Sequence, residues 1–368
     1  MRALKIMLAA LGGLVLLAVA VPLLLLLSYE QSDDAVHLAH KQQYLEQLAS
    51  LPTPMERPNI VLILLDDLGY GDVGAYGAQT ISTPNIDSLA ANGTRYTHYY
   101  SPSPVCSTAR AGMLTGRYPP RAGLAHVVFP EGHMISNGQK IVGMNTRIPA
   151  EEIMLPEILR AVGYNTGMVG KWHMGDVSPS LPNDFGFESY YGARYSNDMQ
   201  PFMLYRNETI EEEAELDQTR MNALYTREVV SFVEQQDSEN PFFLYYAHNF
   251  PHIPLYSSPE QAGQSNAGLY GDVVEDIDRS IGELLRALER KGLTENTLVI
   301  FTSDNGPWYQ GNPGYVRGRK NQTWEGGQRV PFIVQWPEHV AAGVDDVSLI
   351  SGVDLLPTVL RLLALPAP

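Results

Sequence analysis

The sequence has a single cysteine in 368 residues, and its basic side chains are fewer than its acidic ones, 25 against 41. One cysteine cannot form a disulfide within the chain, so Cys106 is an inert buried thiol, a partner for another chain or a reactive group. The formal charge of −16 argues against a nucleic-acid-binding protein, because such a protein needs a basic surface to displace phosphate counterions. We therefore expect no nucleic-acid partner.

Long apolar runs are also missing, with one exception near the N-terminus. The stretch Ile6–Leu27 carries no charge and is long enough to cross a bilayer. The basic residues before it favour a cytoplasmic N-terminus, with the rest of the chain in the periplasm, the extracellular space or a secretory lumen. We expect residues 1–28 to be an uncleaved membrane anchor, with a cleaved signal peptide as the alternative. We expect residues 29–57 to be a spacer that contains a short amphipathic helix.

Repeats and low-complexity tracts are absent as well. After residue 57, short apolar runs alternate with helix-like stretches, which is typical of an α/β protein whose mostly parallel central sheet is sandwiched by helices. The predicted strands are residues 59–65, 166–170, 242–247, 298–303 and 331–336. The predicted helices are residues 85–92, 155–162, 219–235 and 270–291.

Polar side chains follow four of these strands at the point where each strand ends. A polar residue after one strand is ordinary, but four such endings indicate a site, because ligands bind at the carboxyl ends of the strands in open α/β sheets. The side chains delivered there are Asp66 and Asp67, then Lys171 and His173, then His252, and finally Asp304 and Asn305.

Four of these side chains offer only oxygen ligands: Asp66, Asp67, Asp304 and Asn305. Calcium and magnesium prefer oxygen, whereas zinc favours nitrogen and sulfur. Adjacent carboxylates repel each other unless a cation or a shared proton lies between them. The sequence therefore predicts a hard-cation site, and an exposed turn at residues 304–306 is the alternative.

The segment Cys106–Arg117 has the pattern of a helix that begins near Cys106. In a helix, Cys106 and Arg110 lie one turn apart on the same side. The first turn of a helix also offers free backbone N–H groups to an anion. An anionic tetrahedral group at Cys106 would thus meet Arg110, these amides and the cation together, an arrangement that stabilises an oxyanion-rich transition state.

Several stretches, taken in order, resemble the sulfatase family of the alkaline-phosphatase-like superfamily. The resemblance covers roughly residues 58–366, and residues 195–198, Tyr-Ser-Asn-Asp, bring it nearest to the arylsulfatase A and N-acetylgalactosamine-6-sulfatase branch. Each stretch alone is weak, but their order is specific. The stretches are Pro58 to Asp72, Cys106 to Arg117, Gly170 to His173, Pro251 to Pro254, Thr302 to Gly306, and Lys320 with Thr323 to Gly327.

The resemblance implies a formylglycine-dependent hydrolase of aryl sulfates or sulfated sugars. Cys106 is similar to the cysteine that a formylglycine-generating enzyme oxidises, and the hydrated aldehyde attacks sulfur and later expels sulfate. The resemblance also implies that the cation is calcium, held by the modified Cys106 together with the four oxygen ligands.

The same resemblance implies roles for the basic side chains. His252 would protonate the leaving alcohol with help from Lys320, and His173 would assist the elimination of sulfate. The sulfate oxygens would be held by Arg110, Lys171, Lys320 and Ser196.

The chain departs from the family pattern at two places. The family has Pro or Ala two residues after the cysteine, whereas this chain has Thr108; we expect Cys106 to be converted nevertheless, because a β-branched residue tolerates an extended conformation. The family also has a C-terminal antiparallel subdomain, which we expect to be missing from residues 58–368, the predicted catalytic domain. The alternatives are a phosphatase or phosphonate monoester hydrolase of the same superfamily, or an inactive calcium-binding relative.

Overall fold

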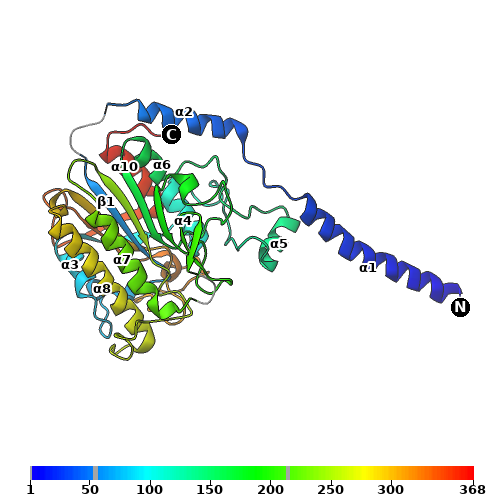
Figure 1. Cartoon of the computed structure of the whole chain (residues 1–368). Coiled ribbons are helices and arrows are strands. Elements are labelled where there is room, and N and C mark those ends of the chain that lie inside the picture. The colour runs from blue at the N-terminus through cyan, green and yellow to red at the C-terminus, as the bar shows by residue number, and fades with distance from the viewer. Residues whose placement is uncertain (1, 53–56, 213–215) are drawn as a thin grey trace.

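A computed structural model describes residues 2–52, 57–212 and 216–368 of the chain (Figure 1). Its centre is a sheet that has ten strands among these residues, in the order β10-β2-β9-β8-β1-β7-β3-β4-β5-β6. Met1 of the predicted anchor and residues 53–56 of the predicted spacer lie outside the described residues.

The five strands in the middle of the sheet are all parallel to one another. They are apolar and buried almost throughout, as expected for strands that helices cover on both faces. The predicted α/β class with a mostly parallel centre is confirmed, and four of the predicted strands belong to this group. In spatial order the group is β8 (Thr297–Ser303), β1 (Asn59–Leu65), β7 (Phe242–Ala247), β3 (Asn165–Gly170) and β4 (Ser189–Gly192).

Further strands flank this group on both sides. The predicted strand at residues 331–336 is β9, and it runs antiparallel to β8 rather than parallel. The other flanking strands were not predicted, because segments such as β2 have partly exposed, polar sequences without a continuous apolar run. The flanking strands are β9 (Phe332–Gln335), β2 (Thr94–Tyr100) and β10 (Val344–Ser351) beyond β8, and β5 (Leu204–Arg206) and β6 (Thr209–Glu212) beyond β4.

Helices pack on both faces of the sheet (Figure 1). Alternate residues of β1 point into different cores, with Ile60 and Leu62 on one side and Val61 and Ile63 on the other. The first core is completed by α2 (Ala35–Ala49), α4 (Cys106–Thr115), α6 (Leu155–Ala161) and α10 (Leu355–Leu362). The second is completed by α3 (Pro84–Ala91), α7 (Met221–Glu234) and α8 (Gly268–Arg290).

The four predicted helices correspond to α3, α6, α7 and α8, with small shifts at their ends. The remaining helices are α1 (Arg2–Ser28), α5 (Met134–Ile141) and the short α9 (Glu325–Gln328). Short 3₁₀ turns lie at Tyr70–Asp72, Gly74–Tyr76, Asn183–Phe185, Gln218–Arg220, Thr294–Asn296 and Gly352–Asp354.

Helix α1 projects away from the rest of the molecule (Figure 1). Its segment Leu4–Ser28 is long and apolar enough to cross a membrane, a test that a signal sequence also passes.

The predicted spacer contains the predicted amphipathic helix, α2, and this helix packs on α6 with Tyr44 buried. A buried ion pair joins the two helices, because Lys41 Nζ lies 2.7 Å from Glu157 Oε1. Lys41 also donates to the carbonyl oxygens of Ala150 and Glu152, each at 2.8 Å. Burial raises the pKa of Glu157 to about 7, although the charge of Lys41 opposes the shift. The segment before residue 58 is thus docked on the domain by specific contacts.

The ion pair between α2 and α6 yields a prediction about stability. Lys41→Met leaves the buried Glu157 without its cation, so we expect a loss of about 3 kcal/mol and a thermal midpoint lower by roughly 5–10 °C. Adding Glu157→Gln to that variant removes the uncompensated charge and should restore at least half of the lost midpoint. Lys291→Met, at an exposed lysine, is the control. Equal midpoints for the wild type and Lys41→Met would contradict this account.

Candidate active site

The four strand ends that were predicted to carry functional side chains lie level with one another. Leu65 of β1 pairs with Ser303 of β8, and Ala247 of β7 pairs with both Leu64 and Gly170. The residues that follow these strands therefore emerge at one edge of the sheet. The structure brings the predicted side chains of all four strand ends together there.

The backbone at this edge adopts conformations that most residues avoid. Gly170 has φ 116°, and a Cβ atom at this position would lie 1.9 Å from the carbonyl oxygen of Ala247. Asp67 and His173 also have positive φ, at 64° and 62°. For non-glycine residues such values cost energy and are held by surrounding contacts, as is common at functional sites.

Cys106 is the first residue of α4, as predicted, and its side chain is buried. Its Sγ lies 3.3 Å from Asp66 Oδ1 and 3.2 Å from Lys320 Nζ. Burial and the charge of Asp66 raise the pKa of the Cys106 thiol far above its usual range, despite the nearby lysines. An unmodified Cys106 is therefore a protonated thiol and a weak nucleophile at neutral pH.

Arg110 lies one turn after Cys106 and is fully buried behind it. Its guanidinium group lies 2.9 Å from Asp304 Oδ2 and 3.5 Å from Asp66 Oδ2. Lys171 also forms an ion pair with Asp66, and it donates to Ser196 Oγ at 3.2 Å. Burial alone would raise the pKa of Asp66, but the neighbouring cations, above all Lys171, hold it well below its usual range. In the structure these two cations contact the carboxylates directly.

Lys320 reaches the same place from the loop before α9. Its Nζ lies 2.8 Å from Asp67 Oδ1, and this contact helps to raise the pKa of Lys320 against the effect of burial. His252 lies beside the pair, with Nε2 3.8 Å from Asp67 Oδ2 and Nδ1 3.3 Å from Ser196 Oγ. Burial lowers the pKa of His252, although the charge of Asp67 acts in the opposite direction.

His173 is buried at the end of the turn after β3. Its Nε2 lies 3.2 Å from the carbonyl oxygen of Val128, whereas its Nδ1 has no hydrogen-bond partner among the described residues. Burial and the charge of Lys171 lower the pKa of His173 well below its usual range. The ring is therefore neutral at physiological pH.

A group of possible metal ligands occupies the centre of the site. Ligand atoms of Asp66, Asp67, Cys106 and His252 all lie within 4.8 Å of one another. The other predicted ligands, Asp304 and Asn305, do not belong to this group. Asp304 is turned toward the guanidinium of Arg110, and the amide nitrogen of Asn305 donates to Asp67 at 2.7 Å.

Two observations nevertheless fit a hard cation held by the oxygen set. Asn305 Oδ1 is buried without a partner among the described residues, and a half-turn of its amide would place this oxygen where the nitrogen now faces Asp67. Burial and the charge of Asp66 raise the pKa of Asp304 to about 6, although Arg110 opposes the shift. A cation among these carboxylates would relieve that repulsion.

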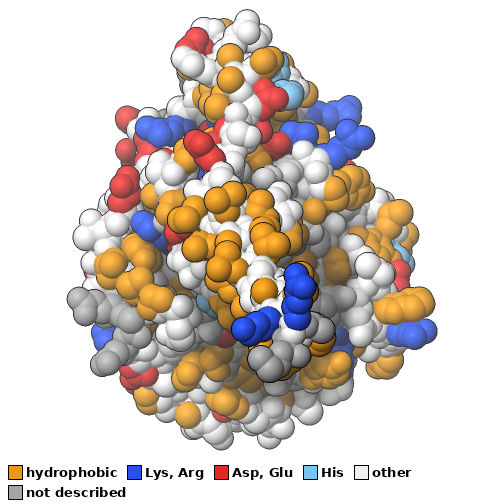
Figure 2. Space-filling model, turned by 90° about the vertical axis from the view of Figure 1, so that its right-hand side faces the viewer, with side chains coloured by type: hydrophobic (Ala, Val, Ile, Leu, Met, Phe, Trp, Pro, Cys, Tyr) orange, Lys and Arg blue, Asp and Glu red, His pale blue; other side chains and the backbone are white. Residues whose placement is uncertain are grey.

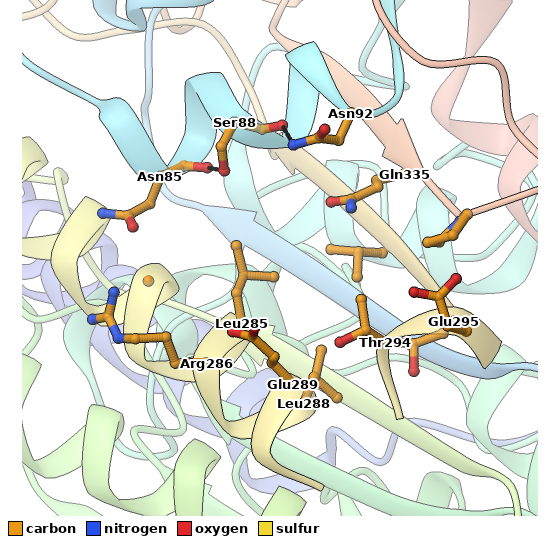
Figure 3. Close-up of a pocket in the computed structure, with 14 residues that line it drawn as sticks. Asn85, Ser88, Asn92, Leu285, Arg286, Leu288, Glu289, Thr294, Glu295 and Gln335 are labelled. Atoms are coloured by element: carbon orange, nitrogen blue, oxygen red, sulfur yellow. Dashed lines mark hydrogen bonds between the residues drawn. The ribbon is translucent and has the colours of Figure 1, made fainter. Parts of the chain in front are cut away.

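Part of the candidate set lines a cavity of about 290 Å³, whose wall includes Cys106, His173, Ser196, His252 and Lys320. Arg110 and Lys171 lie behind this wall and are closed off from solvent. Figure 3 shows a different cavity, of about 320 Å³, between α3 and α8. That cavity is lined by polar side chains such as Asn85, Arg286 and Glu289, and none of the candidate site residues is among those that line it.

Several side chains of the cavity wall were missed by sequence reasoning. Most of them are apolar side chains, which carry no charge that would mark them in advance. Two could have been found from their neighbours, because Asp198 closes the stretch that begins at Tyr195 and Asn321 follows Lys320. The missed residues are Val127, Phe129, Asp198, Met199, Ile253 and Asn321.

Thr108, the residue that departs from the family pattern, points away from the cavity. Its hydroxyl donates to the carbonyl oxygen of Val105 at 2.8 Å and lies 2.6 Å from Ser103 Oγ. As the third residue of α4, it needs no backbone N–H for the helix. A proline at this position would therefore remove no helical hydrogen bond, although it would lose the two hydrogen bonds of the Thr108 hydroxyl.

The amino-acid sequence is similar to those of known sulfatases. The chain is 38% identical to rat N-acetylgalactosamine-6-sulfatase over 87% of this chain and 64% of that protein, and 38% identical to human arylsulfatase A over 84% and 65%. It therefore spans about two thirds of the length of these curated relatives.

Solved structures of known proteins also resemble this chain. The PsFucS1 sulfatase from Pseudoalteromonas sp. superposes with a TM-score of 0.76 at 31% identity, covering 90% of this chain and 72% of that one. Ps i-CgsB, solved in complex with k-i-k-neocarrahexaose, gives 0.76 at 33% identity, covering 85% and 73%. The family model described as Sulfatase matches residues 58–365. The chain belongs to the sulfatase family.

Proposed function

We propose that this chain hydrolyses sulfate esters of aryl alcohols or sugars, releasing inorganic sulfate, through a formylglycine made from Cys106. One observation carries the proposal: the only cysteine of the chain lies within hydrogen-bond distance of Asp66 and Lys320 and in contact range of Asp67. The protonated thiol of Cys106 would be a poor nucleophile. The hydrated aldehyde made from Cys106 would place a reactive oxygen at the same position.

Maturation would supply the nucleophile. Oxidised by a formylglycine-generating enzyme, Cys106 would provide a hydrated aldehyde whose oxygen attacks sulfur and which later releases sulfate. The residues around it keep fixed roles during both steps. Lys320 holds positive charge beside the reacting atoms, and Asp66 and Asp67 accept hydrogen bonds from the groups around position 106.

Calcium is the cation that best suits the site. Its ligands would be Asp66, Asp67, Asp304, Asn305 and the modified Cys106, since a hard cation prefers this oxygen set. When bound, calcium would supply positive charge next to the nucleophile and the sulfate group. It would also take over part of the neutralisation of the carboxylates, which frees Arg110 and Lys171 to turn toward sulfate oxygens.

The remaining side chains of the cavity would bind substrate and move protons. Lys320 and Ser196, with Arg110 and Lys171 behind them, would hold the sulfate oxygens. His252 lines the cavity between Ser196 and Lys320 and would protonate the leaving alcohol. His173, neutral and with no partner for Nδ1 in the part of the chain that the structure describes, would accept a proton during sulfate release.

The N-terminal region would place this site outside the cytoplasm. We propose that α1 is a membrane anchor with a cytoplasmic N-terminus, with a cleaved signal peptide as the alternative. Residues 58–368 would form the catalytic domain, and residues 29–57 would connect it to the anchor. The membrane and the maturing enzyme are then the partners of this chain besides its substrate.

The first prediction concerns Thr108. We expect Thr108→Pro to raise the fraction of Cys106 converted to aldehyde, because the maturing enzyme reads an extended segment and proline favours extension. The measurement is the mass of the Cys106 peptide from full-length chain co-produced with a formylglycine-generating enzyme, which falls by about 18 Da on conversion. Cys106→Ala is the control. An intact, alkylatable thiol at Cys106 in both the wild type and Thr108→Pro would refute the mechanism.

The second prediction concerns calcium. Calcium at about a hundred times its Kd should stabilise the wild type by about 2.7 kcal/mol, seen as a higher thermal midpoint than in chelator. Asp67→Asn removes one ligand charge and should abolish this shift, with a loss of sulfatase kcat/KM of at least about a hundredfold. Asp237→Asn, at an exposed aspartate, should behave like the wild type. A shift that survives Asp67→Asn would rule out this ligand set.

The third prediction concerns the leaving group. His252→Ala should lower kcat about 10²- to 10⁴-fold for sulfate esters of sugars, whose alkoxides need a proton in order to leave. The loss should be far smaller for nitrophenyl sulfate, because nitrophenolate leaves without one. The measurement is the ratio of the two losses, with the exposed His339→Ala as control. Equal losses for the two substrates would assign His252 another role.

A further inference from the structure

Helix α5 and the turn after it expose an unusual group of apolar side chains, which we call the α5 surface. Met134 is 82% exposed, Ile135 44%, Val142 69% and Met144 37%. Four large apolar side chains are thus exposed within a segment of eleven residues, and apolar side chains exposed together mark interaction sites. The opposite side of α5 is fixed to the domain, since Ser136 and Gln139 are buried.

The α5 surface is continuous with the base of α1. The two helices are in contact, and Tyr29, directly after α1, donates to the carbonyl oxygen of Met144 at 2.9 Å. Gln31 donates to the carbonyl oxygen of Arg147 at 3.0 Å and accepts from the backbone N–H of Thr146 at 2.9 Å. The segment that follows α1 is thus hydrogen-bonded to the segment that follows α5.

Figure 2 looks at the molecule from the side on which α1 projects, so this apolar helix points toward the viewer. A bilayer that contained α1 would end near Ser28, where the apolar segment stops. Tyr29 would then lie at the level of the lipid headgroups, a common place for tyrosine. The α5 surface, joined to Tyr29 through Met144, would lie at the same level.

The charges near the α5 surface favour a neutral lipid surface over an acidic one. Lys140 forms an ion pair with Glu131, and Arg147 forms one with Asp33 at 2.7 Å. No other lysine or arginine occurs in residues 131–147. The patch thus offers apolar area without a free basic cluster, and burial of apolar area is what holds interfacial helices at a membrane.

We propose that the α5 surface rests in the interface of the bilayer that α1 crosses, as a second, peripheral membrane contact of this chain. The proposal rests on the membrane assignment of α1 and is independent of the proposed sulfatase activity. One consequence concerns the candidate active site, because α5 supports its wall. Gln139 donates to the carbonyl oxygen of Val127 at 2.7 Å, and His133 stacks on Phe129 with ring centroids 5.1 Å apart.

Val127 and Phe129 line the candidate cavity. The docked helix would therefore hold one wall of this cavity close to the lipid headgroups and fix its orientation relative to the membrane. An anchor consisting of one helix and a flexible linker would not do so.

Quenching by labelled lipid tests the proposal. The full-length chain is placed in phosphatidylcholine vesicles that contain a nitroxide-labelled phosphatidylcholine. A nitrobenzoxadiazole label is attached in turn at Met134→Cys, Val142→Cys, Val347→Cys and Leu14→Cys. Cys106 is buried, and the unsubstituted chain gives its background labelling. Val347, 73% exposed, matches Val142 but lies on β10.

We expect labels at positions 134 and 142 to be quenched at least about twofold more than the label at position 347. Adding Met134→Asp to the chain labelled at position 142 should remove most of that difference, since a charge on this surface opposes insertion. Equal quenching at positions 134, 142 and 347 would overturn the proposal. The label at Leu14 separates the two membrane assignments, because quenching there alone would leave α1 as an anchor and exclude docking of α5.

Discussion

The site is organised by the need to neutralise three carboxylates buried at the ends of two adjacent strands. Asp66, Asp67 and Asp304 are all but inaccessible to solvent, and carboxylates in such surroundings ionise only next to positive charge. Arg110, Lys171 and Lys320 supply that charge, each from a different part of the chain. They lie on α4, on the turn after β3 and on the loop before α9, and each forms an ion pair with at least one of the carboxylates.

The sequence allowed much of this arrangement to be predicted, because apolar strands that end in polar residues determine which side chains meet. It did not reveal how the charges pair. Arg110 and Lys171, which were predicted to hold sulfate oxygens, form ion pairs with buried carboxylates, because opposite charges attract strongly where water is excluded. The apolar residues of the cavity wall could not be predicted either, because no sequence motif marks a side chain such as Phe129.

The margins of the sheet were hard to predict for a related reason. Strands β2 and β10 pair with segments far away in the chain, and their mixed polar sequences resemble loops. In the N-terminal region, too, contacts with distant segments were not evident from the local sequence. A stretch that looks like a linker by composition is fixed to the domain by Lys41 and Tyr44, contacts that depend on tertiary structure alone.

We propose that the charges gathered around Cys106 serve the hydrolysis of sulfate esters. Phosphate esters share the tetrahedral geometry and would also be attracted by Arg110, Lys171 and Lys320, so the choice between them is the most direct test. The measurement is kcat/KM for aryl sulfate and aryl phosphate, with one preparation of full-length chain in calcium whose aldehyde content is known. We expect sulfate to be released faster than phosphate. Preferred release of phosphate by protein with an unmodified Cys106 would contradict it.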